Sequence, residues 1–287
     1  MPFTRSRAPY GFITMNSSTN IVDSLLHPCA SLIRQLLDRK ERSALNLFLI
    51  DDEDNILRAM SAGIVIESIF HAGDEVISTD LRNKLAPGTK IYEVAKRTCK
   101  KIFENDKLSR IFAIAKSPRG NTLESLAGGT RDIVIVEDLS ISGNVGAIIR
   151  TAVAFGMGGI VLTNLEPVDI YDRRLIRASR GFLFSIPIIV ASTEELLQFC
   201  NQRNFTIAVT DPHANTTIDE LSPSADRLFI AFGSERNGCS EPLMQAARLR
   251  LRIPTAADVE SLNVSAAASI ILYKRRRLND VSTPTAR

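Results

Sequence analysis

The chain has 287 residues and a mass of 31.6 kDa, enough for one large domain or two ordinary ones. Because 45% of the residues are apolar and no run approaches the roughly 20 residues of a membrane span, we expect a soluble, cytoplasmic protein. The net charge of +3 permits nucleic-acid binding without requiring it.

The first part of the chain alternates helix-like and strand-like segments. Apolar residues at helical spacing predict an amphipathic helix over residues 21–38. Strands are expected at residues 45–50, 64–70, 90–94 and 111–115. Further helices are expected at residues 55–61 and 96–103. This alternation indicates a small α/β domain, which we assign to residues 1–117.

A segment rich in Pro, Gly, Ser, Asn and Thr follows, and we interpret residues 118–131 as a linker. In residues 132–287, short apolar strands again alternate with helices. The expected strands are 133–136, 159–162, 186–190, 206–209, 228–232 and 251–253. The expected helices are 145–155, 173–180, 194–201, 242–248 and 261–276. Wholly apolar strands are typical of a parallel sheet covered on both faces, so a second α/β domain is predicted here.

Ligands bind at the carboxyl ends of the strands in such sheets, and three loops there have unusual composition. The first turns at Asn144 into a helix on which Gly146, Arg150 and Ala154 form a row four residues apart. An arginine on a helix is ordinarily a solvated surface residue. Here, the small neighbours would let another backbone approach an isolated cation.

The second loop, residues 233–238, has glycines at both ends, which suits either an ordinary turn or backbone that approaches a ligand. It lacks the Gly-Lys-Ser/Thr ending of a phosphate loop, and no GxGxxG follows a strand, which argues against nucleoside triphosphates and dinucleotides. The third loop, residues 253–265, leads into the last helix. Asn263 and Ser265, which are poor helix formers, are expected inside its first turns.

The four cysteines are far apart, and none belongs to a CxxC or Cys/His pair. The sequence therefore predicts free thiols, with neither a zinc site nor a disulfide framework. The cysteines are Cys29, Cys99, Cys200 and Cys239.

Taken in order, the blocks NVGAIIRTAVAFG, FGSERNG and IPTAADVESLNVS resemble the three motifs of the SpoU branch of the SPOUT methyltransferases. The resemblance covers residues 132–278 and is closest to the thiostrepton and nosiheptide resistance RNA methyltransferases. Residues 172–187 are similar to theirs, and the N-terminal domain resembles ribosomal protein L30. Thr255 departs from the pattern, since many relatives have Met there.

The resemblance implies a homodimer whose C-terminal trefoil knot holds S-adenosylmethionine, without a metal. It places the cofactor beside Thr210, Gly233, Ile253, Leu262 and Val264, with glycine at 233 keeping an adenine slot open. Arg180 would either contact an RNA phosphate or complete the partner subunit's cofactor pocket.

The reactive arginine of the family corresponds to Arg150. A guanidinium stays protonated, so we expect it to stabilise the ribose 2′-oxygen as negative charge develops, rather than to act as a base. The polar residues expected to position Arg150 or the ribose are Asn144, Glu235, Ser261 and Asn263.

The function that the resemblance implies is 2′-O-methylation of an adenosine in the thiopeptide-binding region of large-subunit (23S) ribosomal RNA, which confers antibiotic resistance. Two alternatives stay open: a SpoU enzyme acting on transfer RNA or another ribosomal position, and a non-catalytic RNA-binding protein. The N-terminal domain is expected to choose the RNA and to be dispensable for holding the cofactor. Residues 274–277, at the end of the last helix, are either solvated or bound to RNA phosphates. The same two alternatives hold for the cations of the N-terminal domain, which are Arg34, Arg39, Lys40, Arg42, Lys96, Arg97, Lys100, Lys101 and Lys107.

Overall fold

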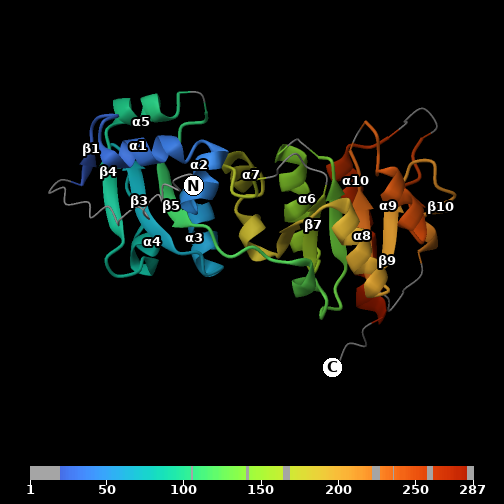
Figure 1. Cartoon of the computed structure of the whole chain (residues 1–287). Coiled ribbons are helices and arrows are strands. Elements are labelled where there is room, and N and C mark those ends of the chain that lie inside the picture. Colours follow the sequence, from blue (N-terminus) through green and yellow to red (C-terminus); the bar gives the residue numbers. More distant parts are fainter. Residues whose placement is uncertain are drawn as a thin grey trace, which may run out of the picture.

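The computed structural model describes residues 20–104, 106–139, 142–163, 169–221, 227–234, 236–256 and 261–282, with side chains of the last helix as far as residue 276. Glu235 and the side chain of Arg277 therefore lie outside the described residues. Figure 1 shows two sheets side by side, with the short helix α7 (Arg173–Ala178) between them.

The N-terminal sheet has five described strands and is mixed. β1, β4 and β3 run parallel, while β5 is antiparallel to both of its neighbours. In sheet order, the strands are β1 (Ile21–Val22), β4 (Lys90–Val94), β3 (Ile66–Ala72), β5 (Ile111–Lys116) and β2 (Leu47–Asp51). The helices are α1 (Pro28–Gln35), α2 (Arg39–Leu45), α3 (Glu53–Ser61), α4 (Thr79–Lys84) and α5 (Lys96–Ile102).

The helix expected over residues 21–38 is wrong in its first part. Val22 belongs to a strand and pairs with Val94, and the helix begins only at Pro28. Proline suits a first helical turn because its missing N–H would be unpaired there, and the His27 ring accepts a hydrogen bond from the Cys29 N–H at 3.2 Å. Helices α2 and α4 were not predicted.

The C-terminal sheet has seven described strands, all parallel, which confirms the predicted α/β class. Its order is β10 (Thr216–Thr217), β12 (Leu249–Arg252), β9 (Thr206–Thr210), β11 (Leu228–Phe232), β6 (Ile133–Glu137), β7 (Gly159–Thr163) and β8 (Ile188–Val190). Besides α7, the α-helices are α6 (Ser142–Ala154), α8 (Thr193–Gln202), α9 (Glu241–Ala246) and α10 (Val264–Ser282). The trefoil knot stays a prediction.

The last helix starts three residues later than expected. Asn263 precedes it and caps it, since its Oδ1 accepts hydrogen bonds from the Ser265 N–H at 3.0 Å and the Ser265 hydroxyl at 2.6 Å. Side-chain oxygens that pair with the first N–H groups of a helix favour its start. The position of Asn263 and Ser265 is thus explained by capping.

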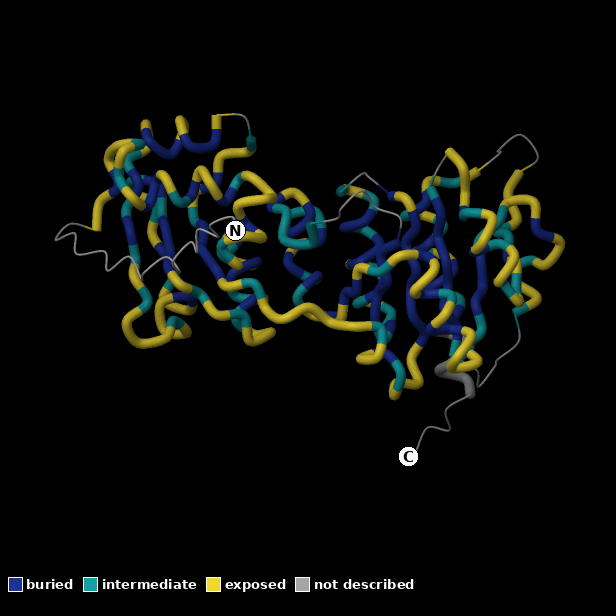
Figure 2. The backbone as a smooth tube through the Cα atoms, in the orientation of Figure 1, coloured by how far each residue is buried: buried dark blue, intermediate teal, exposed yellow. Residues whose placement is uncertain are grey.

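The two sheets are packed together as well as connected. Phe48 of β2 lies against Tyr171 with ring centroids 4.6 Å apart, and apolar residues of both sheets form one continuous core cluster. Residues 118–122 of the segment that connects the two sheets are exposed, and Figure 2 shows exposed chain crossing between the domains. Further along it, a 3-10 helix, η1 (Leu123–Leu126), buries Leu126 in the C-terminal domain.

All four cysteines are buried free thiols. Burial raises the pKa of Cys99 to about 11 and those of Cys200 and Cys239 to about 12, so these thiols stay protonated and weakly nucleophilic at neutral pH. Over the described part of the chain, no group of three His, Cys, Asp or Glu side chains could hold a metal ion, and no helix is long and apolar enough to cross a membrane.

Candidate active site

Three of the expected cofactor residues lie at one edge of the C-terminal sheet. Thr210 ends β9, Gly233 follows β11 and Ile253 follows β12, and these strands are neighbours. Thr210 pairs in register with Leu251 of β12, and its hydroxyl donates to the carbonyl of Ala231 in β11 at 3.1 Å. Because parallel strands end at the same edge, the sheet brings these residues together as predicted.

Gly233 is required by its own loop. A Cβ atom at this position would overlap the Gly238 carbonyl and the Cys239 nitrogen. The two ends of the loop are joined by a pair of backbone hydrogen bonds between Ser234 and Gly238, at 3.1 and 2.9 Å. The expected reason for this glycine, an open adenine slot, is therefore replaced by close contact between the two sides of the loop.

The first and third loops meet where α6 and α10 begin. The Asn263 side-chain amide donates to Asn144 Oδ1 at 3.3 Å, and two turns further along the helices the hydroxyls of Thr151 and Ser269 lie 3.2 Å apart. These contacts bring two of the four predicted positioning residues together. Of the neighbouring residues, Val264 is buried, Leu262 is half-buried and Ser261 is exposed.

Arg150 is exposed on α6 and forms no ion pair with a described residue. Gly146, one turn earlier, is buried against the end of α7, where an added Cβ would overlap Ala178. Ala154, one turn later, is exposed. The expected row of small residues is therefore covered at one end by the chain itself and open at the other, with the free guanidinium between them.

Arg180 lies apart from the cofactor residues, just beyond the end of α7. Its backbone has a φ of +50°, in the left-handed region, and its side chain is exposed. Among the residues that the structure describes, no hydrogen bond or ion pair joins it to Thr210, Gly233 or Ile253. Thr255 is also exposed.

Glu137, which ends the inner strand β6 and is 1% exposed, was not among the predicted site residues. Its carboxylate accepts hydrogen bonds from the Ser240 N–H at 2.7 Å, the Ser240 hydroxyl at 2.8 Å and the Thr193 hydroxyl at 2.9 Å. Ser240 lies two residues after the loop that contains Gly233, so Glu137 anchors the end of that loop to β6. The available signal was a carboxylate closing an otherwise apolar strand, IVIVE.

We expect Glu137→Ala to weaken S-adenosylmethionine binding about tenfold or more. Glu137→Ala leaves the partly buried Ser240 N–H without its partner, which costs about 1–3 kcal/mol when the loop is in its native position, and each 1.4 kcal/mol is a factor of ten in affinity. Glu137→Gln should recover part of the affinity, because its carbonyl can still accept from Ser240. The control is Glu195→Ala, which removes an exposed cap at the start of α8. Calorimetry checks this, and wild-type affinity in Glu137→Ala would show that the anchor is dispensable.

Two family models together match most of the chain. The model described as the SpoU rRNA Methylase family matches residues 132–273, and the model described as Thiostrepton-resistance methylase, N terminus, matches residues 19–129. Among curated relatives, the 23S rRNA (adenosine(1067)-2′-O)-methyltransferase of Streptomyces laurentii is 34% identical over 86% of this chain and 93% of its own length. The protein of the same description from Streptomyces azureus is 28% identical over 88% of this chain and 96% of its own length.

Solved structures of RNA methyltransferases are similar to this chain over both domains. A crystal structure of an RNA 2′-O ribose methyltransferase matches with a TM-score of 0.77 and 30% identity, covering 90% of this chain and 98% of its own. An AdoMet-bound rRNA methyltransferase from Sinorhizobium meliloti matches with a TM-score of 0.78 and 26% identity over the same shares of the two chains. The chain therefore belongs to the SpoU rRNA methylase family and joins an S-adenosylmethionine-dependent methyltransferase domain to the N-terminal domain of the thiostrepton-resistance methylases.

Proposed function

We propose that this protein methylates the ribose 2′-hydroxyl of an adenosine in the thiopeptide-binding region of 23S ribosomal RNA, and thereby confers resistance of the thiostrepton and nosiheptide type. The match of residues 19–129 to the thiostrepton-resistance N terminus carries this proposal. The SpoU part is common to methyltransferases with other targets, whereas the N-terminal part distinguishes this group. Acting on ribosomal RNA would place the protein in the cytoplasm.

A second target within 23S rRNA is supported by another relative. The 23S rRNA (guanosine(2553)-2′-O)-methyltransferase RlmP of Bacillus subtilis is 25% identical over 85% of this chain. It therefore also spans both domains. A guanosine elsewhere in the same RNA is accordingly the alternative substrate.

For the chemistry, S-adenosylmethionine supplies a methyl group on a positively charged sulfur. The loop ends at Thr210, Gly233 and Ile253, with Leu262 and Val264, would hold it through backbone groups and apolar side chains, which suit a flat adenine. Gly233 in its tight loop and half-buried Leu262 fit that role.

Arg150 would hold the 2′-oxygen as its proton is lost to solvent and negative charge develops during attack on the methyl carbon. Its exposed guanidinium is free of ion pairs with the described residues and so is available to a substrate. Asn144 and Asn263, which bond to each other, with Ser261 and Glu235, would position the ribose or Arg150.

We assign RNA binding to residues 1–117, a linker to residues 118–131 and catalysis to residues 132–287. Two cations of the expected RNA face have other roles in the structure. Arg42 is 5% exposed and is paired with Asp169, while Arg275 is 2% exposed and is paired with Asp132. Lys274 and Lys96 form exposed pairs with Asp219 and Asp74. Exposed cations on the neighbouring helices α1 and α5 remain for RNA phosphates: Arg34, Arg97, Lys100 and Lys101.

We predict a homodimer with twice the 31.6 kDa of one chain. Ala154, the exposed end of the row of small residues on α6, lies on the same side as α10, which packs against α6. Two apolar side chains of α10 are also exposed: Ile270 at 39% and Tyr273 at 54%. Tyr273 packs on Phe155, which links the two helices into one surface. Light scattering at micromolar concentration should report the dimer, and an active monomer would contradict it.

The experiment that tests the proposed function is a map of ribose methylation on ribosomal RNA from cells with and without the gene. One additional 2′-O-methyl adenosine in the thiopeptide-binding region, together with thiostrepton resistance, is the expected result. A new methyl group at another nucleotide would move the target. No difference between the two RNAs would favour a non-catalytic RNA-binding protein or a transfer RNA substrate.

A further inference from the structure

Residues 169–181 lie between the two domains and contact both of them; we name them the adaptor segment. They contain α7, which Figure 1 shows between the two sheets. At its start, Asp169 accepts hydrogen bonds from the buried Arg42 of α2, with Nε and Nη2 both at 2.6 Å. Arg42 also donates to the carbonyls of Leu36 and Leu37, so its direction is fixed within the N-terminal domain.

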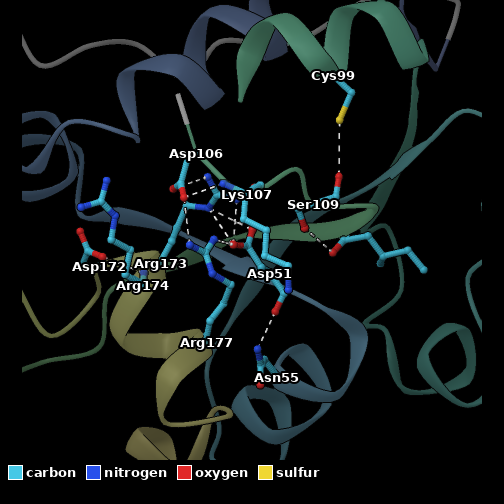
Figure 3. Close-up of polar contacts among 11 residues, drawn as sticks. Asp51, Asn55, Cys99, Asp106, Lys107, Ser109, Asp172, Arg173, Arg174 and Arg177 are labelled. Carbon is cyan, nitrogen blue, oxygen red and sulfur yellow. Dashed lines mark hydrogen bonds and ion pairs between the residues drawn. The ribbon is translucent and has the colours of Figure 1, made fainter. Parts of the chain in front are cut away.

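About one turn further along, the adaptor segment supplies the arginines and the N-terminal domain supplies the carboxylates. Asp51, at the end of β2, accepts from Arg173 at 2.8–3.0 Å and from Arg177 at 2.6 Å (Figure 3). Asp106 accepts from the same two arginines at 3.2 and 3.0 Å. Asp51 and Arg173 are 2% exposed or less. Two carboxylates of the N-terminal domain thus hold two guanidinium groups of the catalytic domain in one network.

These pairs fix direction as well as contact. A guanidinium presents its donors in a rigid plane, so two arginines that share two carboxylates leave α7 little rotational freedom. Although burial opposes ionisation of Asp106, the Lys107 N–H and the two arginines lower its pKa, so it is charged at neutral pH. Arg173 also lies over the Phe103 ring at 4.2 Å.

The other end of the adaptor segment contacts the catalytic helix. Ala178 and Ser179 lie against the backbone of α6 at Gly146, one turn before Arg150 and two residues after Asn144. Gly181, with a φ of +70°, turns the chain so close to α3 that an added Cβ would lie 3.1 Å from the Asn55 oxygen. Since no side-chain layer separates these elements, displacement of α7 has to be transmitted to α6.

We propose that the adaptor segment locks the N-terminal domain to the Arg150 helix at one orientation, and that Asp51 and Asp106 are positioning residues for methyl transfer. RNA held by the N-terminal domain then meets Arg150 at a fixed distance and angle. The role of Asp51 and Asp106 in methyl transfer rests on the proposed function, whereas the fixed orientation of the two domains does not. The proposal also revises the expectation that the N-terminal domain is dispensable for holding the cofactor, because a fragment starting near Gly128 would leave Arg173 without its carboxylates and uncover Tyr171.

The test compares Asp106→Asn with Asp80→Asn in the full chain. Asp106 is partly exposed, so the variant keeps the shape and the buried Asp51 pairs while it removes one charge of the network. Asp80 forms an exposed pair with Lys84 in the same domain, away from the adaptor segment. We expect unchanged S-adenosylmethionine affinity and RNA KM in both variants, and a roughly tenfold lower kcat in Asp106→Asn alone, since a small misplacement far from the chemistry can cost up to about 100-fold in rate.

A second measurement reports orientation without RNA or activity. Spin labels at Asn83→Cys and Gln202→Cys, both exposed, would not compete with the four buried native thiols. The distance distribution should be narrow in the otherwise native chain and in Asp80→Asn, and broader in Asp106→Asn.

An equally narrow distribution in Asp106→Asn would overturn the lock. A broadened distribution with wild-type kcat would overturn the positioning role. If the protein has no activity on 23S rRNA, the proposed function fails, while the distance measurement still decides the lock.

Discussion

Arg150→Ala should reduce the rate of RNA methylation by about 100- to 1,000-fold, the loss found when a donor to a developing oxyanion is removed. Arg150 is exposed on α6 and makes no ion pair with a described residue, so its removal should leave the fold and S-adenosylmethionine affinity almost unchanged. Single-turnover kinetics with saturating RNA and cofactor measures the effect. Arg203→Ala, which removes an exposed arginine paired with Glu124, is the control and should methylate normally.

Two further measurements define the role of Arg150. Arg150→Lys keeps the charge without the planar donor pair and should recover only part of the rate. RNA with a 2′-deoxy group at the target nucleotide should bind but accept no methyl group. Methylation of that RNA, or near-normal turnover by Arg150→Ala, would move the acceptor from ribose to base and remove the role assigned to this residue.

Gly233→Val should weaken S-adenosylmethionine binding about 100-fold while leaving the overall fold intact. The new side chain would overlap the backbone of Gly238 and Cys239, so the loop at the end of β11 has to open. Forcing extra atoms into a packed site costs about 1–3 kcal/mol, and a branched side chain against fixed backbone belongs at the upper end, near 100-fold in affinity. Calorimetry should lose the binding heat while circular dichroism stays unchanged.

The control for this variant is Gly120→Val, at a position in the connecting segment where an added Cβ meets nothing within 4 Å. It should bind the cofactor normally. If Gly233→Val also binds normally, the loop after β11 does not form the cofactor site. If it unfolds, Gly233→Ala provides the smaller perturbation, and cofactor affinity should then fall less than for valine.

Much of the fold and part of the site could be predicted from local sequence. The apolar strand over residues 228–232 and the strand over residues 90–94 have the predicted bounds, because runs of about five residues are too short for an ordinary helix and favour a strand. The three motif loops were identifiable because Gly, Asn and Pro mark the ends of strands and the starts of helices. Parallel strands then bring Thr210, Gly233 and Ile253 to one edge without any further information.

Side chains whose partners are distant in sequence were decided only by the tertiary structure. From their sequence neighbours alone, Arg42 and Arg173 would be expected on the surface. In the structure, each is buried against a carboxylate that is more than 100 residues away in the sequence. Glu137 acquires its role only when β6 lies beside the ends of α8 and α9. Periodicity records which face of an element is apolar, whereas a buried charge depends on which opposite charge the fold brings within a few ångströms. For that reason, the motifs could be identified from the sequence, while the link between the two domains could not.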